Sequence, residues 1–343
     1  MATVTKTDLQ LQILTSGQWE RWDHFVRESP QGTVFQTTPY LNAFSDAFKR
    51  RTEILTVLEN EEIIAGVVLF PKKRGGIEYT TSPYLVAFNG ILIKDVSSFK
   101  SYFKKVKYQQ KVIALLQREL ERRFQYCEIY LASSLIDIRS LIWQNWRIQP
   151  DYTIFIPLQG KTDPLDIIPH NQRRHIKKFE KSSFTFEEFS DFTTCYNLMS
   201  QSYQHHGMKP PIGLKDFEEF VSILSTNNYL KTYVISIAKN PVAFMMLVED
   251  RPRVYALFSG KDFVQERTEA ELYLHWRLIR LYREQLYDTF DLLGAMSPSI
   301  SRVKLELGGK LIRQDVARYF KNSLIRFLLK AETFRQMRNR RNF

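Results

Sequence analysis

The sequence predicts a mixed α/β fold built from two similarly ordered halves. Its 343 residues exceed the usual size of one hydrophobic core, and 44% of them are hydrophobic, so both halves can pack. Helical and strand patterns follow the same order in each half, without a low-complexity tract or a Pro, Gly or Ser-rich linker between them. We therefore expect the halves to meet near residues 150 to 165, with a cleft between them.

The first half is expected to form one mixed α/β layer unit. A strand and two helices come first, and the second helix has proline in its first turn. Paired strands joined by a tight turn, a long helix and a short strand follow. The expected strands are at 9–14, 52–58, 63–70 and 128–132, and the expected helices are at 19–27, 39–48 and 108–123.

The second half repeats this order and opens with a basic helix. Its expected helices are at 173–181, 193–205 and 214–224 and from residue 268 onward, and its expected strands are at 184–189, 230–238, 242–248, 254–258 and 290–293. We assign residues 1–155 to an N-terminal domain, 156–322 to a C-terminal domain and 323–343 to a basic amphipathic C-terminal helix. We expect this helix to dock on the body, and a peripheral membrane contact is the alternative.

Charge and cysteine content limit the partners and the compartment. Forty-nine Lys and Arg against 37 Asp and Glu give a net charge of +12, which favours phosphorylated small molecules, nucleic acid or an anionic membrane face. The two cysteines lie in unrelated contexts, so we expect a reducing, cytoplasmic compartment. No secretion signal is visible at the start, and no apolar run approaches the roughly 20 residues that span a bilayer.

Several chemical classes have no motif in this sequence. It contains no Walker loop, no Cys-x-x-Cys, no His-Glu-x-x-His and no Gly-x-Ser-x-Gly. These absences argue against a P-loop ATPase, a zinc site and an α/β-hydrolase. We accordingly expect no metal site.

Lys304 is the first candidate for a catalytic side chain. The expected strand at 290–293 ends at Gly294, and Lys304 lies four residues before the Gly308-Gly309 pair, in a context that reads as a hairpin-like turn. A fixed ammonium in a cleft would stabilise the oxyanion that forms when an amine attacks a carbonyl. The alternative is a solvated lysine in a turn.

The motifs of the second half resemble those of the FemAB-type aminoacyltransferases and the wider acyltransferase group with paired GNAT-like domains. The matches are Leu274-His275-Trp276, Tyr287 through Asp291 to Gly294-Ala295, Val303-Lys304 through Leu307-Gly308-Gly309, the basic run Gln172 to Lys178, and Phe35-Gln36-Thr37 in the first half. The resemblance covers nearly the whole chain. It implies two GNAT-like domains, each with a mixed, mostly antiparallel sheet flanked by helices.

The resemblance also implies an enzyme, an N-acyltransferase or aminoacyltransferase that forms an amide. It implies an activated donor, either aminoacyl-tRNA or acyl-CoA, and no further cofactor. The expected acceptor is a cell-envelope, peptidoglycan or polysaccharide precursor, and Gln36 and Asp291 are expected to bind substrate. Phe44 and His205 stand where many relatives have lysine and arginine, and no long coiled coil is present, so the broader acyltransferase branch is favoured over a role in cell-wall bridge formation.

Three further residues are candidates near the same site. His205, followed by His206 and Gly207, can take the proton from the attacking amine, or it can interact with the dipole of a helix that Gly207 ends. Tyr255 and Ser259 lie at the end of the strand before the long helix, and a tyrosine in that place more often packs than reacts. The loop at 259–267 has one glycine and two acids, which makes a poor pyrophosphate cradle for coenzyme A.

The basic helix is the candidate surface for anionic substrates. Arg174 and Lys177 share one face with Lys181, and Arg173 precedes them. This face can bind the phosphates of a nucleotide-linked or tRNA-borne substrate, or it can simply be solvated. It also supports the alternative function, a catalytically degenerate protein that holds RNA or an anionic glycan in a basic cleft.

Overall fold

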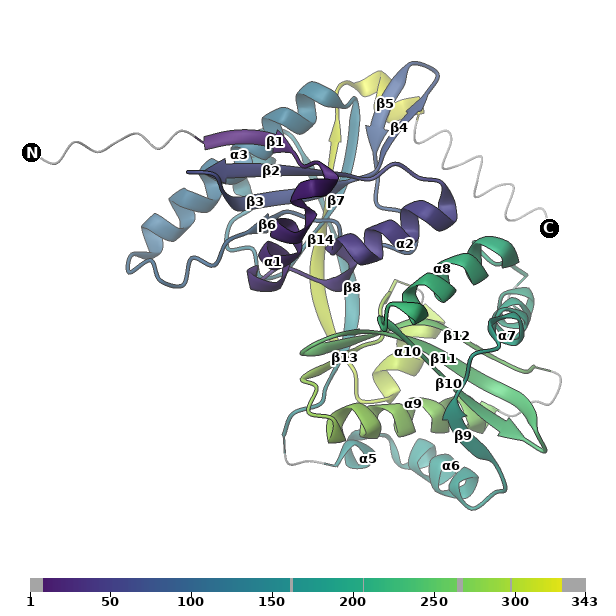
Figure 1. Cartoon of the computed structure of the whole chain (residues 1–343). Helices are drawn as coiled ribbons and strands as arrows, with labels where there is room; N and C mark the ends of the chain where they lie inside the picture. Colours follow the sequence, from purple (N-terminus) through teal and green to yellow (C-terminus); the bar gives the residue numbers. More distant parts are fainter. Residues whose placement is uncertain (1–8, 161–162, 206, 264–267, 297, 329–343) are drawn as a thin grey trace, which may run out of the picture. The chain divides into compact units, whose positions relative to one another are not determined.

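The computed structural model describes residues 9–160, 163–205, 207–263, 268–296 and 298–328, and these form two compact units (Figure 1). Of the described residues, 9–151 and 314–328 belong to unit 1, and 152–313 belong to unit 2. The chain passes between the units within two strands that sequence analysis did not find, β8 (Arg147–Pro157) and β14 (Lys310–Phe320). Residues 314–322 were expected in the C-terminal domain, but 315–320 pair antiparallel with β7 of unit 1.

Unit 1 contains a four-stranded antiparallel sheet in the order β1-β2-β3-β6 and a second group of strands, β4, β5, β7 and the end of β14. Its strands are β1 (Leu9–Ile13), β2 (Glu53–Glu59), β3 (Glu62–Leu69), β4 (Pro71–Arg74), β5 (Ile77–Thr80), β6 (Leu92–Ile93) and β7 (Tyr126–Leu131). Its helices are η1 (Ser16–Gln18), α1 (Trp19–Glu28), η2 (Val34–Gln36), α2 (Thr38–Phe48), α3 (Tyr102–Arg123) and α4 (Arg139–Trp143).

Helices cover both faces of β3, which explains why this strand is a continuous apolar run. Ala65 and Val67 lie on the face that packs against α3. Gly66, on the opposite face, leaves room for Trp22 of α1: a Cβ at Gly66 would lie 2.5 Å from the indole ring. A strand buried on both faces needs apolar residues at every position rather than at alternate ones.

Unit 2 contains a sheet in the order β8-β13-β12-β11-β10-β9. Only the β12–β13 pair is parallel among the neighbours whose register is described. Its other strands are β9 (Thr185–Glu188), β10 (Leu230–Ile237), β11 (Asn240–Asp250), β12 (Arg253–Lys261) and β13 (Thr289–Asp291). Its helices are α5 (Pro164–Ile167), α6 (His170–Glu180), α7 (Phe192–His205), α8 (Leu214–Thr226), α9 (Thr268–Glu284) and α10 (Pro298–Glu306).

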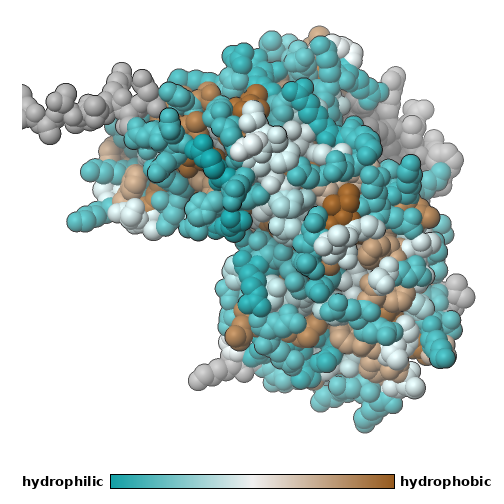
Figure 2. All heavy atoms as spheres, in the orientation of Figure 1, coloured by the Kyte–Doolittle hydropathy of each residue, from teal (hydrophilic) through white to brown (hydrophobic). Residues whose placement is uncertain are grey.

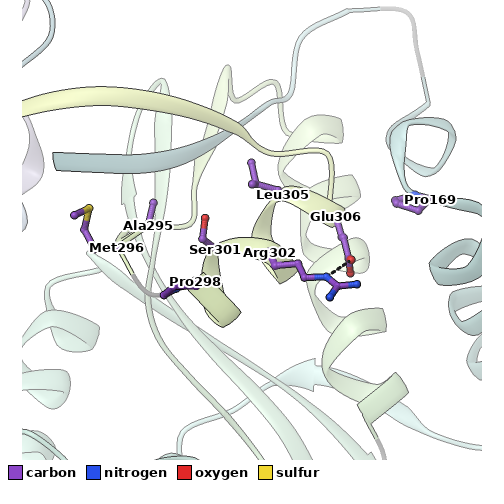
Figure 3. A pocket seen from close by; sticks show the side chains of 8 residues that line it. All are labelled: Pro169, Ala295, Met296, Pro298, Ser301, Arg302, Leu305 and Glu306. Carbon is purple, nitrogen blue, oxygen red and sulfur yellow. Dashed lines mark hydrogen bonds and ion pairs between the residues drawn. The ribbon is translucent and has the colours of Figure 1, made fainter. Parts of the chain in front are cut away.

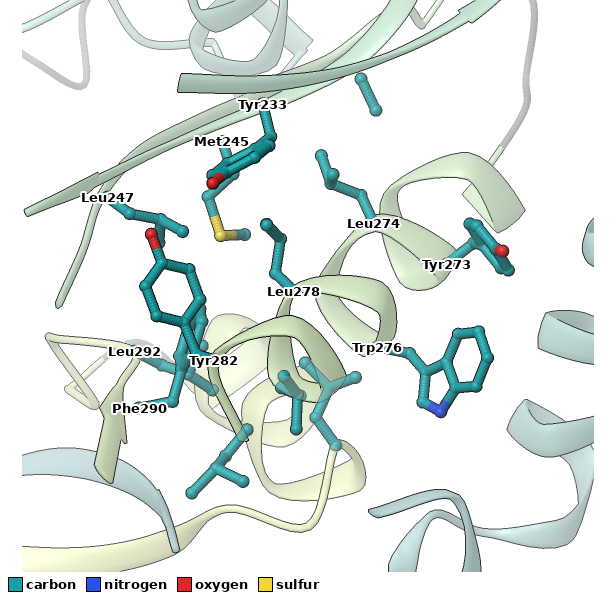
Figure 4. Close-up of a cluster of buried hydrophobic side chains, with 14 of the residues drawn as sticks. Tyr233, Met245, Leu247, Tyr273, Leu274, Trp276, Leu278, Tyr282, Phe290 and Leu292 are labelled. Atoms are coloured by element: carbon teal, nitrogen blue, oxygen red, sulfur yellow. The ribbon is translucent and has the colours of Figure 1, made fainter. Parts of the chain in front are cut away.

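The core of unit 2 lies between α9 and the sheet. Met245 and Leu247 of β11 pack with Leu274 and Leu278 of α9, and Figure 4 shows these side chains pointing toward one another. Helices α7 and α8 cover the other face, as Figure 1 shows. There α7 approaches β12 so closely that a Cβ at Gly260 would lie 2.6 Å from a backbone nitrogen of α7. The expected fold class, mixed mostly antiparallel sheets flanked by helices, is confirmed in both units.

The surface of unit 1 in Figure 2 shows hydrophobic atoms in separate groups among hydrophilic ones. Within the described part of the chain, no helix combines the length and the apolar character that crossing a membrane requires. Most of the basic helix expected at 323–343 falls outside the described residues, so its docking stays a prediction.

Candidate active site

Two neighbouring strands of unit 2 part at the position of Asp291. β12 and β13 pair in parallel only as far as Tyr255 and Asp291. Beyond this point β12 continues along β11, whereas the chain after Asp291 follows β8, where Leu292 N donates to Ile154 O at 2.9 Å. The end of β13 therefore stands where two strands diverge, a place at which a sheet can admit a ligand between its strands.

Asp291 carries a fully buried carboxyl group at this point. Its Oδ1 accepts hydrogen bonds from Thr153 Oγ1 at 2.5 Å and from Leu293 N at 2.8 Å. Among the described residues its Oδ2 has no hydrogen-bond partner. Burial raises the pKa of Asp291 to about 7, although these hydrogen bonds and the charge of Lys304 act in the opposite direction. The carboxyl group therefore exchanges a proton near neutral pH, as groups at functional sites often do.

Lys304 lies on α10, and the expected hairpin-like turn at this position is wrong. Pro298 begins the helix and Gly308, with φ 86°, follows its end, so the glycine pair acts as a helix stop. The Lys304 Nζ donates to the carbonyl oxygens of Leu292 at 2.7 Å and Gly294 at 2.9 Å, and also to that of Leu293. All three ammonium protons are thus directed at the backbone that follows Asp291.

Lys304 and Asp291 both form hydrogen bonds with the backbone of residues 292–294, which has an unusual conformation. Leu293 and Gly294 have φ values of 50° and 47°, in the left-handed region that is costly for a leucine. The Asp291 carboxyl accepts from the amide of Leu293, and Lys304 binds the carbonyls on either side. Burial lowers the pKa of Lys304 to about 8, with the charge of Asp291 opposing the shift. We call Asp291, Lys304 and residues 292–294 the clamp.

His275 is a functional candidate that sequence analysis recognised only as part of a motif. It lies in α9 with 8% of its surface exposed, and its Nδ1 forms a hydrogen bond with Glu271 O at 2.9 Å. Burial lowers the pKa of His275, and the nearby charges of Lys304 and Lys261 lower it further. Lys261 in turn forms an ion pair of 2.7 Å with Glu271. In the sequence, the signal that could have indicated His275 was its place within an apolar helical stripe, four residues after a glutamate.

A pocket of about 520 Å³ lies on α10 beside the clamp (Figure 3). Its lining residues are Pro169, Ala295, Met296, Pro298, Ser301, Arg302, Leu305 and Glu306. Ala295 and Met296 continue the chain from the clamp, so the two features share one segment. Glu306 accepts from Arg302 at 3.0 Å and from Gln172 of α6 at 3.0 Å. The pocket thus combines an apolar wall with one ion pair.

The structure places Tyr255 next to the clamp and His205 at the end of α7. Tyr255 is 1% exposed and lies opposite Asp291 in the parallel register. Burial raises its pKa well above the ordinary value, so its phenol stays protonated. Ser259 is exposed on the part of β12 beyond the divergence. The His205 ring stacks on Phe263 at 4.2 Å between centroids, at the end of α7. His206 and loop residues 264–267 fall outside the described residues.

The basic helix is confirmed as α6, and most of its cations face solvent. Arg174, Lys177 and Lys178 are exposed. Arg173 lies 3.7 Å from Asp166, so part of its charge is balanced. Helix α6 packs on α9, and its Gln172 contacts the pocket residue Glu306. The exposed cations are therefore on an element that also borders the pocket.

Gln36 belongs to the interior of unit 1. It is 1% exposed, its Nε2 donates to Gly90 O at 3.0 Å, and its Oε1 accepts from Thr33 Oγ1 at 3.3 Å. Its backbone carbonyl also accepts from the indole of Trp22 at 2.7 Å. Both ends of the side-chain amide are thus engaged in tying loops of unit 1 together, and we do not include Gln36 in the candidate site.

Replacing His275 should change how stability depends on acid. Because the folded state lowers the pKa of His275 from its ordinary 6.5, the unfolded chain takes up the proton first as pH falls, and stability is lost below about pH 6.5. As pH falls from 7 to 5, we expect the unfolding free energy of wild type, measured by urea unfolding, to decrease more than that of His275→Gln. The exposed His170→Gln is the matched control, and equal slopes for all three proteins would contradict this account.

Comparison with known proteins supports the fold of both units. The family model of the acetyltransferase (GNAT) domain matches residues 170–298, which contain β12, α9 and Asp291. No curated protein matches the sequence.

Solved structures resemble the chain over nearly its whole length. FemX matches with a TM-score of 0.67 and 11% identity, over 89% of this chain and 96% of FemX. The C-terminal domain of a putative lysylphosphatidylglycerol synthetase from Agrobacterium fabrum matches with a TM-score of 0.57 and 12% identity, over 92% and 96%. A tandem GNAT protein from the clavulanic acid biosynthesis pathway matches with a TM-score of 0.53 and 9% identity, over 92% and 99%. At such low identity the likeness shows the fold.

Proposed function

We propose that this chain is an acyltransferase that forms an amide, because the model of the GNAT acetyltransferase domain matches residues 170–298 and the fold resembles those of FemX and of a tandem GNAT protein. An amine nitrogen of the acceptor attacks the acyl carbon of an activated donor, and a C–N bond forms. The thioester C–S bond of an acyl-CoA, or the ester C–O bond of an aminoacyl-tRNA, breaks, and the amine gives up a proton. The divergence of β12 and β13 at the clamp is the observation that carries the proposal.

The residues of the clamp suit this reaction by their charge and position. The Lys304 ammonium has its three N–H donors on backbone carbonyls, so it acts on a developing oxyanion through its charge and through the backbone that it holds. Asp291 is fully buried and does not reach solvent, so we give it a positioning role. Its carboxylate fixes Thr153 and the amide of Leu293. His275, which burial keeps neutral, is the candidate proton acceptor.

The pocket on α10 is proposed to bind the substrate group next to the reacting carbonyl. Its apolar wall fits an aliphatic acyl chain or side chain, and Arg302 fits a carboxylate or phosphate. The exposed cations of α6 would hold the phosphates of an acyl-CoA or of an aminoacyl-tRNA. The similarity to the C-terminal domain of a lysylphosphatidylglycerol synthetase, an enzyme named for a lipid product, favours an acceptor from the cell envelope. Both donors are cytoplasmic, so the proposal includes a cytoplasmic location.

Filling the pocket should weaken substrate binding more than it slows turnover. Leu305 lines the pocket, whereas Val303 on the same helix is 51% exposed and outside it. We expect Leu305→Trp to raise KM about tenfold or more with a small change in kcat, since lost pocket volume is worth a few kcal/mol of binding. Val303→Trp is the matched control. If both variants raise KM equally, the pocket does not hold the substrate.

The direct test of the proposed function is transfer by the purified full chain. The protein is incubated with a panel of acyl-CoA thioesters, with aminoacyl-tRNA and with amine acceptors, and free thiol, deacylated tRNA and amide products are measured. Acceptor-dependent donor loss with a matching amide supports the transferase.

A second function is favoured by one observation, the exposed Arg174, Lys177 and Lys178 on α6. A binding protein would hold RNA or an anionic glycan on this face without turnover. Salt-sensitive retention of RNA or an anionic glycan, together with no donor consumption in any combination, would favour it over the transferase.

A further inference from the structure

Large aromatic side chains are exposed together on unit 1, far along the sequence from the candidate active site. Tyr102 and Phe103 begin α3 and are 69% and 70% exposed, and Trp143 ends α4 and is 60% exposed. Sequence periodicity placed the start of this helix at residue 108, and the structure begins it six residues earlier. We call Tyr102, Phe103, Trp143 and the adjoining Arg139 the aromatic surface.

Specific contacts place these residues on one surface. The Arg139 guanidinium lies over the Trp143 ring at 5.3 Å from its centroid, and it interacts electrostatically with Tyr102. The loop before α4 is fastened to α3, because Gln110 donates to Asp137 at 2.6 Å. The two helices therefore present their aromatic side chains side by side.

The aromatic surface continues the core-facing side of α3 beyond the core. Residues 102, 109, 113, 116 and 120 follow one another at intervals of three, four or seven, so they lie on the same face of the helix. Ile113, Leu116 and Leu120 are fully buried in the core of unit 1. Tyr102 lies on that face but is exposed, since the first turns of α3 reach the periphery of unit 1 (Figure 1). The helix thus presents an apolar end that no described part of unit 1 covers.

The segment that carries the start of α3 has charges of one sign. Between residues 96 and 118 the chain has lysines at 100, 104, 105, 107 and 111 and no Asp or Glu. Lys104 and Lys107 are exposed, and Lys107 lies 5.9 Å from the centroid of the Phe103 ring. Of the acids that interact with this region, Asp137 is paired with Arg139 at 2.9 Å and Asp95 interacts with Lys105.

We propose that the aromatic surface docks unit 1 on an anionic lipid bilayer. Tyrosine and tryptophan rings settle at the boundary between lipid headgroups and acyl chains, where one end of each ring is apolar and the other polar. Lysine side chains extend their ammonium groups to lipid phosphates from the same depth. The combination of exposed rings and surrounding lysines matches the two requirements of reversible interfacial binding, apolar burial and charge attraction. This inference does not depend on the proposed transferase activity.

The test is sedimentation of the full chain with vesicles of phosphatidylcholine alone and of phosphatidylcholine mixed with phosphatidylglycerol. We expect binding to the mixed vesicles and a decrease with added salt. Phe103→Ser with Trp143→Ser should weaken partitioning about tenfold or more. Lys104→Glu with Lys107→Glu should weaken it about fivefold or more per lysine. Thermal unfolding of each variant verifies that it is folded.

Matched controls separate this surface from general charge attraction. Tyr84→Ser removes another ring of unit 1, 65% exposed, and should leave binding unchanged. Lys321→Glu reverses a charge elsewhere in the unit and should have a much smaller effect. Trp143→Phe should retain binding but lose the blue shift of tryptophan fluorescence that insertion produces.

Three outcomes would overturn the proposal. The first is wild-type protein that stays in solution with mixed vesicles. The second is a Phe103→Ser, Trp143→Ser variant that binds them like wild type, which would assign the binding to another basic segment. The third is a variant that keeps vesicle binding and loses a specific protein partner, which would make the surface a protein interface.

Discussion

Asp291→Asn is expected to be much less active than wild type. It is also expected to lose less unfolding free energy than wild type as pH rises from acid to neutral. Folding raises the pKa of Asp291 from 3.8 to about 7, so ionising this carboxyl group costs the folded state free energy. The cost is absent near pH 4, grows as pH rises and is complete above about pH 7. The unfolding free energy of wild type should therefore fall by about 4 kcal/mol relative to that of Asp291→Asn over this window.

The change of unfolding free energy with pH, rather than its difference between the two proteins at one pH, tests this prediction. Asparagine can keep the oxygen that accepts from Thr153 and Leu293, but its NH₂ replaces an oxygen without a hydrogen-bond partner among the described residues. That unsatisfied group costs about 1–2 kcal/mol at every pH. Urea unfolding at several pH values for both proteins, with the exposed Asp288→Asn as control, separates the two effects. Parallel curves of unfolding free energy against pH for wild type and Asp291→Asn would show that the carboxyl group carries no buried charge.

The activity of Asp291→Asn should fall about 100-fold if the carboxylate positions the site, since misplacing catalytic groups by a fraction of an ångström has effects of this size. In wild type we expect kcat/KM to rise with pH through about 7, and this limb should disappear in the variant. A purely structural role would lower activity without moving the pH profile.

Lys304→Met is expected to cost both stability and activity. The substitution removes the donor that serves the carbonyls of residues 292–294 and a cation whose charge stabilises the ionised form of the buried Asp291. Leaving these groups without their partner should lower the unfolding free energy by about 2–4 kcal/mol. Transfer should fall at least about 100-fold, because the left-handed backbone at Leu293 and Gly294 loses its support.

Two comparisons show which property of Lys304 matters. Lys304→Arg keeps the charge but presents a planar fork that does not match three converging carbonyls, so partial rescue would assign the role to charge alone. Lys310→Met, an exposed lysine at the start of β14, is the matched control. Because folding lowers the pKa of Lys304 to about 8, wild type should also gain stability relative to Lys304→Met as pH rises from about 8 to 10.5. Full transfer activity in Lys304→Met would remove Lys304 from the mechanism.

Local patterns predicted most individual elements but not the environments of the site residues. The periodicity of apolar residues was sufficient for α7, α8 and the β10–β11 pair, because each follows from its own residues. Lys304 was expected in a turn, since a glycine pair after a short apolar segment is typical of a hairpin as well as of a helix end. Which of these forms depends on whether the lysine finds buried partners, and its partners lie ten to twelve residues earlier in the chain.

The strands that connect the units were missed for a related reason. β8 and β14 each cross from one unit to the other, so the residues that support them belong to different parts of the fold. A short-range pattern cannot report that residues 315–320 pair with β7, almost 190 positions away. Thr153 was missed likewise, because its bond to Asp291 joins residues 138 positions apart.

The sequence by itself determined the order of the elements, their repetition in two halves, the GNAT-like fold and the presence of Lys304 and Asp291 in the motifs of the second half. The order and the repetition follow from local periodicity and composition, which act over a few residues, whereas the fold and the two site residues follow from the resemblance of the motifs. Only the tertiary structure decided that Lys304 is a helical residue bound to three carbonyls, that Asp291 is fully buried with a pKa near neutrality, and that His275 interacts electrostatically with Lys304. Burial and charge depend on distances between residues far apart in the chain, and packing alone sets those distances.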